Sequence, residues 1–154
     1  MTPKMICFDM DGTIANLYGV NGWKEMLDAR RTTPYAVAKP MCDMRELATI
    51  CKTLHASGIE IRVVTWLSKN STKAYEKAVT ETKIAWLKKH HFPYDKVHAI
   101  SYGTSKRETI LPYLKGNETA WIFDDDARVR ADWNIGKAID PTICDILDTL
   151  RSLI

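Results

Sequence analysis

The sequence predicts an α/β protein with a three-layer, doubly wound parallel sheet. Short apolar runs that are typical of buried strands alternate along the 154 residues with longer segments of helical periodicity. Such alternation is typical of a parallel sheet covered by helices on both faces. Several of the predicted strands end in polar or acidic residues. Because ligands bind outside the carboxyl ends of the strands in open α/β sheets, we expect a single domain over residues 1–154 with its site at that edge.

The composition is that of an ordinary globular protein. Hydrophobic residues make up 45% and charged residues 27% of the chain, and its length suffices for one domain with a full core. The formal net charge of +3 is too mild to argue for nucleic acid as a partner. The four cysteines include no Cys-x-x-Cys pair, which argues against a structural zinc site. There is no signal-peptide pattern and no apolar stretch near ~18 residues, so we expect a cytoplasmic protein without a membrane partner.

The first predicted strand, Met5 to Phe8, ends abruptly in acidic residues. The sequence Asp9-Met10-Asp11-Gly12-Thr13 follows and predicts a tight loop at the carboxyl end of that strand. Two carboxylates so close together repel each other unless a positive charge lies between them. A divalent cation is the simplest solution, and hard oxygen ligands suit Mg²⁺.

The segment that follows, Ile14 to Lys39, predicts a small cap insertion at about residues 14–40. It contains glycines, prolines and aromatic residues, and Trp23 to Arg31 is compatible with a short helix. Long connections in compact domains are usually functional or disordered. We therefore expect this insertion to lie over the Asp-x-Asp loop.

Three later segments have the apolar period of helices. The first runs from Asp43 to Ser57 and the second from Ser71 to His90. The third is predicted to begin with Asp140 as its cap and Pro141 in its first position. The apolar stripe of this last helix would consist of Ile143, Ile146, Leu147, Leu150 and Ile154.

The remaining predicted strands also lead into polar residues. They cover 59–64, 97–101, 120–123 and a short fifth piece at 137–139. Thr65 follows the first of these, and Asp124, Asp125 and Asp126 follow the third. A capping-box pattern from Ser105 to Glu108 would place Lys106 in the first turn of a short helix. If the sheet is parallel, these polar residues share one edge with Asp9 and Asp11.

Taken in order, these motifs resemble those of the haloacid dehalogenase-like (HAD) superfamily over nearly the whole chain. The Asp-x-Asp-Gly-Thr sequence at 9–13 is similar to the first motif of that superfamily, and Thr65 at a strand end resembles the second. Lys106 resembles the third motif, a lone basic residue, and Asp124-Asp125 the fourth, an acidic pair. The resemblance implies a Rossmann-like fold and a phosphatase activity.

The resemblance also implies a role for each motif residue. Asp9 would be the nucleophile that forms an aspartyl-phosphate, and Asp11 the general acid and base. Thr65 and Lys106 would bind the oxygens of the transferred phosphoryl group. Mg²⁺ would be held by Asp9, the backbone carbonyl of Asp11 and Asp124. Asp125 would belong to the same metal site and orient either Lys106 or a metal-bound water.

Other residues near these motifs are weaker candidates. Gly12 and Thr13 adjoin the acidic loop and are predicted to contact the substrate. Trp66 directly follows Thr65, so it could stack on a substrate ring, although core packing explains it equally well. Arg128 and Arg130 follow the acidic motif and could contact a phosphate or a base, although a charged loop facing water is the default expectation.

The predicted substrate is a (deoxy)nucleotide or another small phosphate ester. Asp11 argues for phosphate rather than carbon–halogen chemistry, because dehalogenating relatives lack this second carboxylate. The stretch from Thr82 to Phe92 resembles the 5'(3')-deoxyribonucleotidase-like branch. The insertion is shorter than in that branch, which permits larger substrates or a lid from a second subunit of a homo-oligomer. The alternatives are a non-catalytic phosphate- or metal-binding module and a phosphatase for nucleic-acid ends, against which the mild charge argues.

Overall fold

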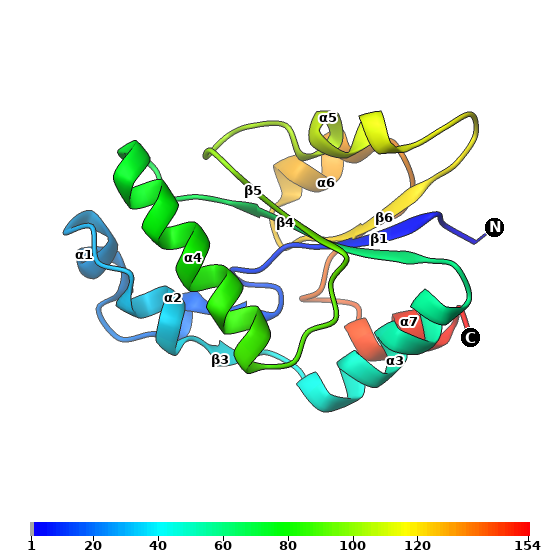
Figure 1. The fold of residues 1–154 in the computed structure, drawn as a ribbon, viewed down its shortest axis with the longest axis horizontal. Coiled ribbons are helices and arrows are strands. Elements are labelled where there is room, and N and C mark those ends of the chain that lie inside the picture. The colour runs from blue at the N-terminus through cyan, green and yellow to red at the C-terminus, as the bar shows by residue number, and fades with distance from the viewer. Residues whose placement is uncertain (1) are drawn as a thin grey trace.

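The structure, a computed structural model, describes residues 2–154 and contains an open parallel sheet with helices on both faces (Figure 1). In these residues the strand order is β5–β4–β1–β6–β7, and neighbouring strands run parallel. The strands are β1 (Met5–Phe8), β4 (Glu60–Trp66), β5 (Lys96–Ile100), β6 (Ala120–Phe123) and β7 (Ala138–Ile139). The predicted fold class, a doubly wound α/β sheet, is confirmed.

The register of the sheet brings the carboxyl ends of β1 and β6 to one level, and β4 extends three residues beyond it to Trp66. Phe8, the last residue of β1, lies opposite Val63 of β4 and Phe123 of β6. The backbone N–H of Asp9 then donates to the carbonyl of Phe123 at 3.0 Å. The chain passes from β1 to β4 on one side and later returns to β6 on the other, so β1 is the point at which the strand order reverses. Such switch points are where open α/β sheets bind their ligands.

Two apolar clusters hold the helices on opposite faces of the sheet. On one face, α3 (Met44–Ala56), α7 (Ile146–Arg151) and part of α4 (Lys73–Lys89) pack against Phe8, whose ring stacks on Phe123 at 5.2 Å between centroids. On the other face, α5 (Lys106–Ile110), followed by η2 (Leu111–Tyr113), and α6 (Ala127–Trp133) cover Cys7 and Ile122. Within residues 2–154, no helix combines the length and the apolar character that crossing a membrane requires.

The segment predicted as a cap folds into short elements between β1 and α3. They are β2 (Ala15–Asn16), η1 (Leu17–Gly19), α1 (Trp23–Asp28), α2 (Thr33–Val37) and β3 (Lys39–Pro40). The antiparallel pair β2–β3 closes the base of this insertion. The predicted short helix at Trp23 therefore exists, although it ends three residues before Arg31.

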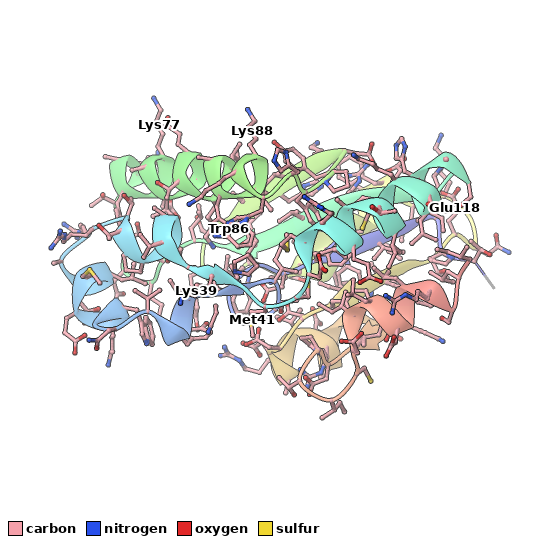
Figure 2. All side chains as sticks on the ribbon, turned by 90° about the horizontal axis from the view of Figure 1, so that it is seen from below. Lys39, Met41, Lys77, Trp86, Lys88 and Glu118 are labelled. Carbon is pink, nitrogen blue, oxygen red and sulfur yellow. The ribbon has the colours of Figure 1, made fainter. Side chains whose placement is uncertain are left out.

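The cap packs against the helix that follows β4. Tyr35 of the cap shares an apolar cluster with Tyr75 and Val79 of α4. Further along α4, Trp86 points toward the segment around Lys39 (Figure 2), and its Nε1 donates to the carbonyl of Ala38 at 2.7 Å. The position of the cap is thus fixed by α4.

The prediction for the start of the final helix was wrong. The carboxylate of Asp140 accepts from the backbone N–H of Thr142 at 2.9 Å in a turn, and Ile143 is 81% exposed. Helix α7 begins at Ile146 and is capped by Asp145, whose Oδ2 accepts from the N–H of Asp148 at 2.9 Å. Both aspartates are suitable caps. The helix begins after Asp145 because the apolar residues that pack into the core begin at Ile146. Ile154, predicted in the same stripe, is exposed.

The structure also contains a helix where a solvated loop was expected. Asp126 caps α6 by accepting from the N–H of Arg128 at 2.8 Å, and the Arg128 side chain is exposed as predicted. The hydrogen bonds from Arg128 lower the pKa of Asp126 to about 2. The signal for this helix was the pair Val129 and Trp133, which lie four residues apart and are both buried.

Candidate active site

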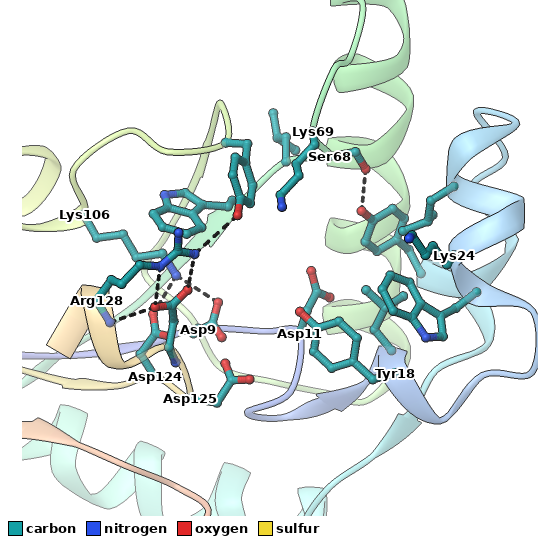
Figure 3. A pocket seen from close by; sticks show the side chains of 18 of the residues that line it. Asp9, Asp11, Tyr18, Lys24, Ser68, Lys69, Lys106, Asp124, Asp125 and Arg128 are labelled. Carbon is teal, nitrogen blue, oxygen red and sulfur yellow. Dashed lines mark hydrogen bonds and ion pairs between the residues drawn. The ribbon is translucent and has the colours of Figure 1, made fainter.

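A pocket of about 540 Å³ opens at the carboxyl ends of β1, β4 and β6, beneath the cap (Figure 3). Most of its acidic lining comes from the core loops, and its aromatic lining comes from both the core and the cap. The acidic residues are Asp9, Asp11, Asp28, Asp124, Asp125 and Asp126; the aromatic residues are Tyr18, Trp23, Tyr35, Trp66 and Tyr102; the cationic residues are Lys24, Lys69, Lys106 and Arg128. Residues of the insertion therefore line the same pocket as Asp9 and Asp11 of the Asp-x-Asp loop.

Asp9 is buried at the end of β1, and each of its carboxylate oxygens has a hydrogen-bond donor. Oδ2 accepts from the hydroxyl of Thr13 at 3.0 Å, and Oδ1 accepts from Nζ of Lys106 at 2.9 Å. Donors on both oxygens fix the plane of the carboxylate, which suits a group that must meet an electrophile in one direction.

Lys106 connects the first acidic motif to the last. It lies in the first turn of α5, whose cap Ser105 accepts from the N–H of Glu108 at 3.1 Å, as the capping-box pattern predicted. Its Nζ donates to Oδ2 of Asp124 at 2.7 Å as well as to Asp9. Burial opposes the charged form, but the two carboxylates outweigh it and raise the pKa of Lys106 above its ordinary value. The lysine is therefore a permanent cation in the floor of the pocket.

Three carboxylates in this floor form a group that can hold a metal ion. In the part of the chain that the structure describes, oxygens of Asp9, Asp124 and Asp125 lie within 4.8 Å of one another. Burial, and then the negative charge of Asp9, raises the pKa values of both Asp124 and Asp125. Lys106 supplies one positive charge against three carboxylates, so the group fits a divalent cation with a preference for oxygen ligands.

Asp11 and Asp125 were also predicted to belong to the metal site. The carboxylate of Asp11 lies outside the group of three, so its predicted backbone contact with the metal stays a prediction. Asp125 was expected to orient Lys106 or a metal-bound water, but the Lys106 bonds go to Asp9 and Asp124. Asp125 instead lies against Gly12, where an added Cβ would stand 2.3 Å from its Oδ2.

Gly12 and Thr13 are placed behind the carboxylates rather than in the pocket wall. Gly12 has a positive φ of 81°, and its N–H donates to the carbonyl of Ala15 at 2.9 Å. Thr13 is buried, and its hydroxyl donates a hydrogen bond to Asp9. These residues shape the loop that holds Asp9, and their predicted contact with a substrate stays a prediction.

Thr65 faces a buried lysine that the sequence reasoning missed. Thr65 is inside β4, is fully buried, and its Oγ1 accepts from Nζ of Lys83 at 2.6 Å. Its hydroxyl is therefore engaged by Lys83, and its predicted contact with phosphoryl oxygens stays a prediction. Lys83 was detectable in principle, because it continues the buried stripe of Tyr75 and Val79 at the helical period, where a charge needs a partner.

Asp11 lies across the pocket from Asp9, on the side of the cap (Figure 3). Its Oδ2 accepts from Nζ of Lys83 at 2.9 Å. Burial raises the pKa of Asp11, and the charge of Asp9 adds to this, although Lys83 opposes it. A carboxyl group with raised proton affinity beside a nucleophile is suited to general acid and base catalysis.

Trp66 forms part of the pocket wall beside the buried cation, as its predicted contact with a substrate requires. Its ring lies 4.9 Å from that of Tyr102 and 5.2 Å from Nζ of Lys106. Its Nε1 donates to the carbonyl of Thr104 at 2.8 Å, which fixes the plane of the indole. Arg128 lies 5.8 Å from the same ring. An aromatic surface flanked by cations thus adjoins the acidic floor.

The comparisons with known proteins identify the fold. No family model matches the chain, and no curated protein matches it. A chain in a structure of the Pnkp1/Rnl/Hen1 RNA repair complex aligns with a TM-score of 0.59 and 17% identity, over 90% of this chain and 42% of that one. D,D-heptose 1,7-bisphosphate phosphatase from Burkholderia thailandensis aligns with a TM-score of 0.53 and 12% identity, over 87% of this chain and 74% of that one. The chain thus spans less than half of the first protein's length, and at these identities the likeness shows a HAD-like fold.

Proposed function

We propose that this chain is a magnesium-dependent phosphomonoester hydrolase that acts through an aspartyl-phosphate on Asp9. The observation that carries the proposal is the arrangement around Lys106, whose ammonium group joins Asp9 to Asp124 in the floor of a pocket that also contains Asp11. The HAD-like fold supports it, because the motif residues lie at the sheet edge where that fold would use them.

In the proposed reaction, the carboxylate of Asp9 attacks phosphorus, and the bond from phosphorus to the ester oxygen breaks. Asp11 gives its proton to the departing oxygen. Water then attacks phosphorus in the aspartyl-phosphate, Asp11 takes a proton from it, and inorganic phosphate leaves with Asp9 restored. Lys106 offsets negative charge on the phosphoryl oxygens next to Asp9 throughout.

The group of Asp9, Asp124 and Asp125 would hold Mg²⁺. When bound, the ion neutralises charge on the phosphate and orients it for in-line attack. We assign Thr65 an indirect part, because its hydroxyl accepts a hydrogen bond from Lys83 and is buried away from the pocket. Tyr18 and Trp23 line the pocket from the cap of the same chain, so the proposal needs no lid from a second subunit.

The proposed substrate is a (deoxy)nucleotide or another small phosphate ester. Support comes from Trp66, which offers an aromatic face beside Lys106. The 5'(3')-deoxyribonucleotidase-like resemblance of residues 82–92 adds little. Trp86 in this stretch is buried and donates to the carbonyl of Ala38, so core packing accounts for it.

A phosphatase for nucleic-acid ends is the second candidate. The observation that favours it is the rim of the pocket, where Trp66 and Tyr102 lie beside Lys69 and Arg128. Aromatic faces flanked by cations suit stacked bases joined by phosphates. The likeness to a chain of an RNA repair complex is consistent with this candidate.

Hydrolysis of p-nitrophenyl phosphate with and without Mg²⁺ tests the activity. We expect turnover that requires Mg²⁺ and that Asp9→Asn abolishes. If no such turnover occurs, the enzyme assignment is wrong and a non-catalytic phosphate- or metal-binding module remains.

The substrate class is tested with nucleoside monophosphates and with oligonucleotides that carry a terminal phosphate. For nucleic-acid ends, kcat/KM should fall steeply between about 50 mM and 200 mM salt, because binding the chain releases counterions. For a mononucleotide or another small ester, the dependence on salt should be shallow.

A further inference from the structure

Lys83 is a buried cation for which the proposed reaction has no use so far. Its side chain is 1% exposed in the middle of α4, whereas Lys77 and Lys88 of the same helix extend into solvent (Figure 2). Taking an ammonium group out of water costs several kcal/mol unless good partners replace the water. The position of Lys83 therefore depends on the groups that it meets.

Each N–H of the Lys83 ammonium group has an acceptor. Nζ lies 2.6 Å from Oγ1 of Thr65, 2.8 Å from the carbonyl oxygen of Trp66 and 2.9 Å from Oδ2 of Asp11. A lysine has three donors, so these acceptors use its full capacity. Two of them belong to β4, which is part of the sheet, so the ammonium group is anchored to the rigid core before it meets Asp11.

Lys83 is also tied to the cap. Its Nζ lies 4.9 Å from the centre of the Tyr35 ring, and the Tyr35 hydroxyl is hydrogen-bonded to Oγ of Ser68 at 2.5 Å. The ammonium group thus lies where the cap, α4 and the end of β4 meet. Among residues 2–154, no side chain other than Lys83 donates a hydrogen bond to the carboxylate of Asp11.

We propose that Lys83 is a positioning residue for Asp11. It holds Oδ2 of Asp11 on the cap side of the pocket, so that the carboxyl group faces Asp9 in the orientation needed for proton exchange with the leaving oxygen and with water. This inference rests on the proposed function, because it concerns the acid and base of that reaction. Without Lys83, no side chain that the structure describes would fix the rotamer of Asp11, and the carboxyl group would lose the orientation needed for proton transfer.

The test is the dependence of kcat/KM on the leaving group in a series of substituted phenyl phosphates. This parameter reports the steps up to the phosphoenzyme, in which Asp11 acts as the acid. A nitrophenolate leaves without help, whereas a more basic phenolate needs a proton. In Lys83→Met we expect the loss for phenyl phosphate to exceed the loss for p-nitrophenyl phosphate by about tenfold or more. Lys77→Met, the matched control on the same helix, should leave the dependence unchanged.

A purely structural role predicts a different result. If Lys83→Met lowers kcat/KM by one factor for the whole series, or not at all, the inference is overturned. The proposed function still stands in that case, provided that the unaltered protein shows turnover that needs Mg²⁺ and Asp9.

A second variant and a direct measurement cover the remaining outcomes. Lys83→Gln keeps a polar end group and is used if Lys83→Met does not fold. Crystal structures of the unaltered protein and of Lys83→Gln show the position of the Asp11 carboxylate whether or not the protein is active. A carboxylate displaced in the variant, with β1 unchanged, supports the inference, and a carboxylate in the same place overturns it.

Discussion

The Nζ atom of Lys106 lies 2.9 Å from Oδ1 of Asp9, although 97 positions separate the two residues in the chain. The same atom lies 2.7 Å from Oδ2 of Asp124. The three residues come from the starts of different loops and helices, so their contact requires that β1, α5 and β6 are packed together. The charge balance of the site is therefore a property of the folded sheet and not of any single motif.

Replacing Lys106 by methionine should destabilise the protein and remove most of its activity. The change leaves the carboxylates of Asp9 and Asp124 buried without their cation, which costs about 3–5 kcal/mol in the free energy of unfolding. We expect kcat/KM to fall by at least about 10²-fold. Urea denaturation without Mg²⁺ and steady-state kinetics measure the two effects. Arg107→Met, at the next and more exposed position, is the control; equal losses in both variants would contradict the assignment.

Asp11→Asn should separate the two halves of the reaction. An amide cannot take a proton from water, so hydrolysis of the aspartyl-phosphate should slow by about 10²–10⁴-fold. Formation of the phosphoenzyme from p-nitrophenyl phosphate should continue, because its leaving group needs no acid. Rapid mixing should show a burst of nitrophenolate equal to the enzyme concentration. Steady turnover at the unaltered rate would show that Asp11 is not the base.

Gly12→Ala should weaken metal binding more than it weakens the fold. An alanine at this position takes on the strain of a positive φ, and its Cβ would also stand 2.3 Å from Oδ2 of Asp125. Gly103→Ala is the control, because Gly103 has a φ of 87° but open space around its Cβ position. Both variants should lose about 1 kcal/mol of stability from backbone strain. Calorimetric titration should show Mg²⁺ affinity reduced by about tenfold or more in Gly12→Ala alone.

His98 should make the protein less stable as the pH falls. It lies on β5, is 8% exposed, and its Nε2 is 3.1 Å from Nη1 of Arg62. Burial and the charge of Arg62 lower the pKa of His98 from 6.5 to about 4. At a pH between about 4 and 6.5, His98 binds a proton in the unfolded chain but not in the folded protein. The stability contributed by neutral His98 is therefore present above pH 6.5 and is lost as the pH falls toward 4.

The size of this effect follows from the same pKa values. The full pKa shift of His98 corresponds to a loss of at most about 3 kcal/mol in the free energy of unfolding. Denaturant unfolding at neutral pH and at about pH 5 should show a smaller decrease for His98→Gln than for the unaltered protein. Parallel pH profiles for the two proteins would mean that other groups account for the acid sensitivity.

Much of the site could be predicted because its residues stand at strand ends or at a marked helix start. Asp9 and Asp124 directly follow short apolar runs, whose ends a parallel sheet brings together, and Lys106 lies inside a clear capping pattern. Lys83 could not be paired in this way. Its partner Asp11 lies 72 positions away, and their contact depends on how α4 packs against β4. The same packing turns the Thr65 hydroxyl toward α4, which no local pattern encodes.

The chain enters and leaves the cap through the two paired strands β2 and β3. Asn16 lies opposite Lys39, and Ala15 lies opposite Pro40, so the chain leaves the core and rejoins it through neighbouring strands. The cost of closing a loop grows only slowly with its length, so the segment between these strands can lengthen or shorten without moving β1 or α3. The cap is thus an exchangeable module: grafting a different segment onto this stem would change the pocket lining above Asp9 and leave the acidic floor unchanged.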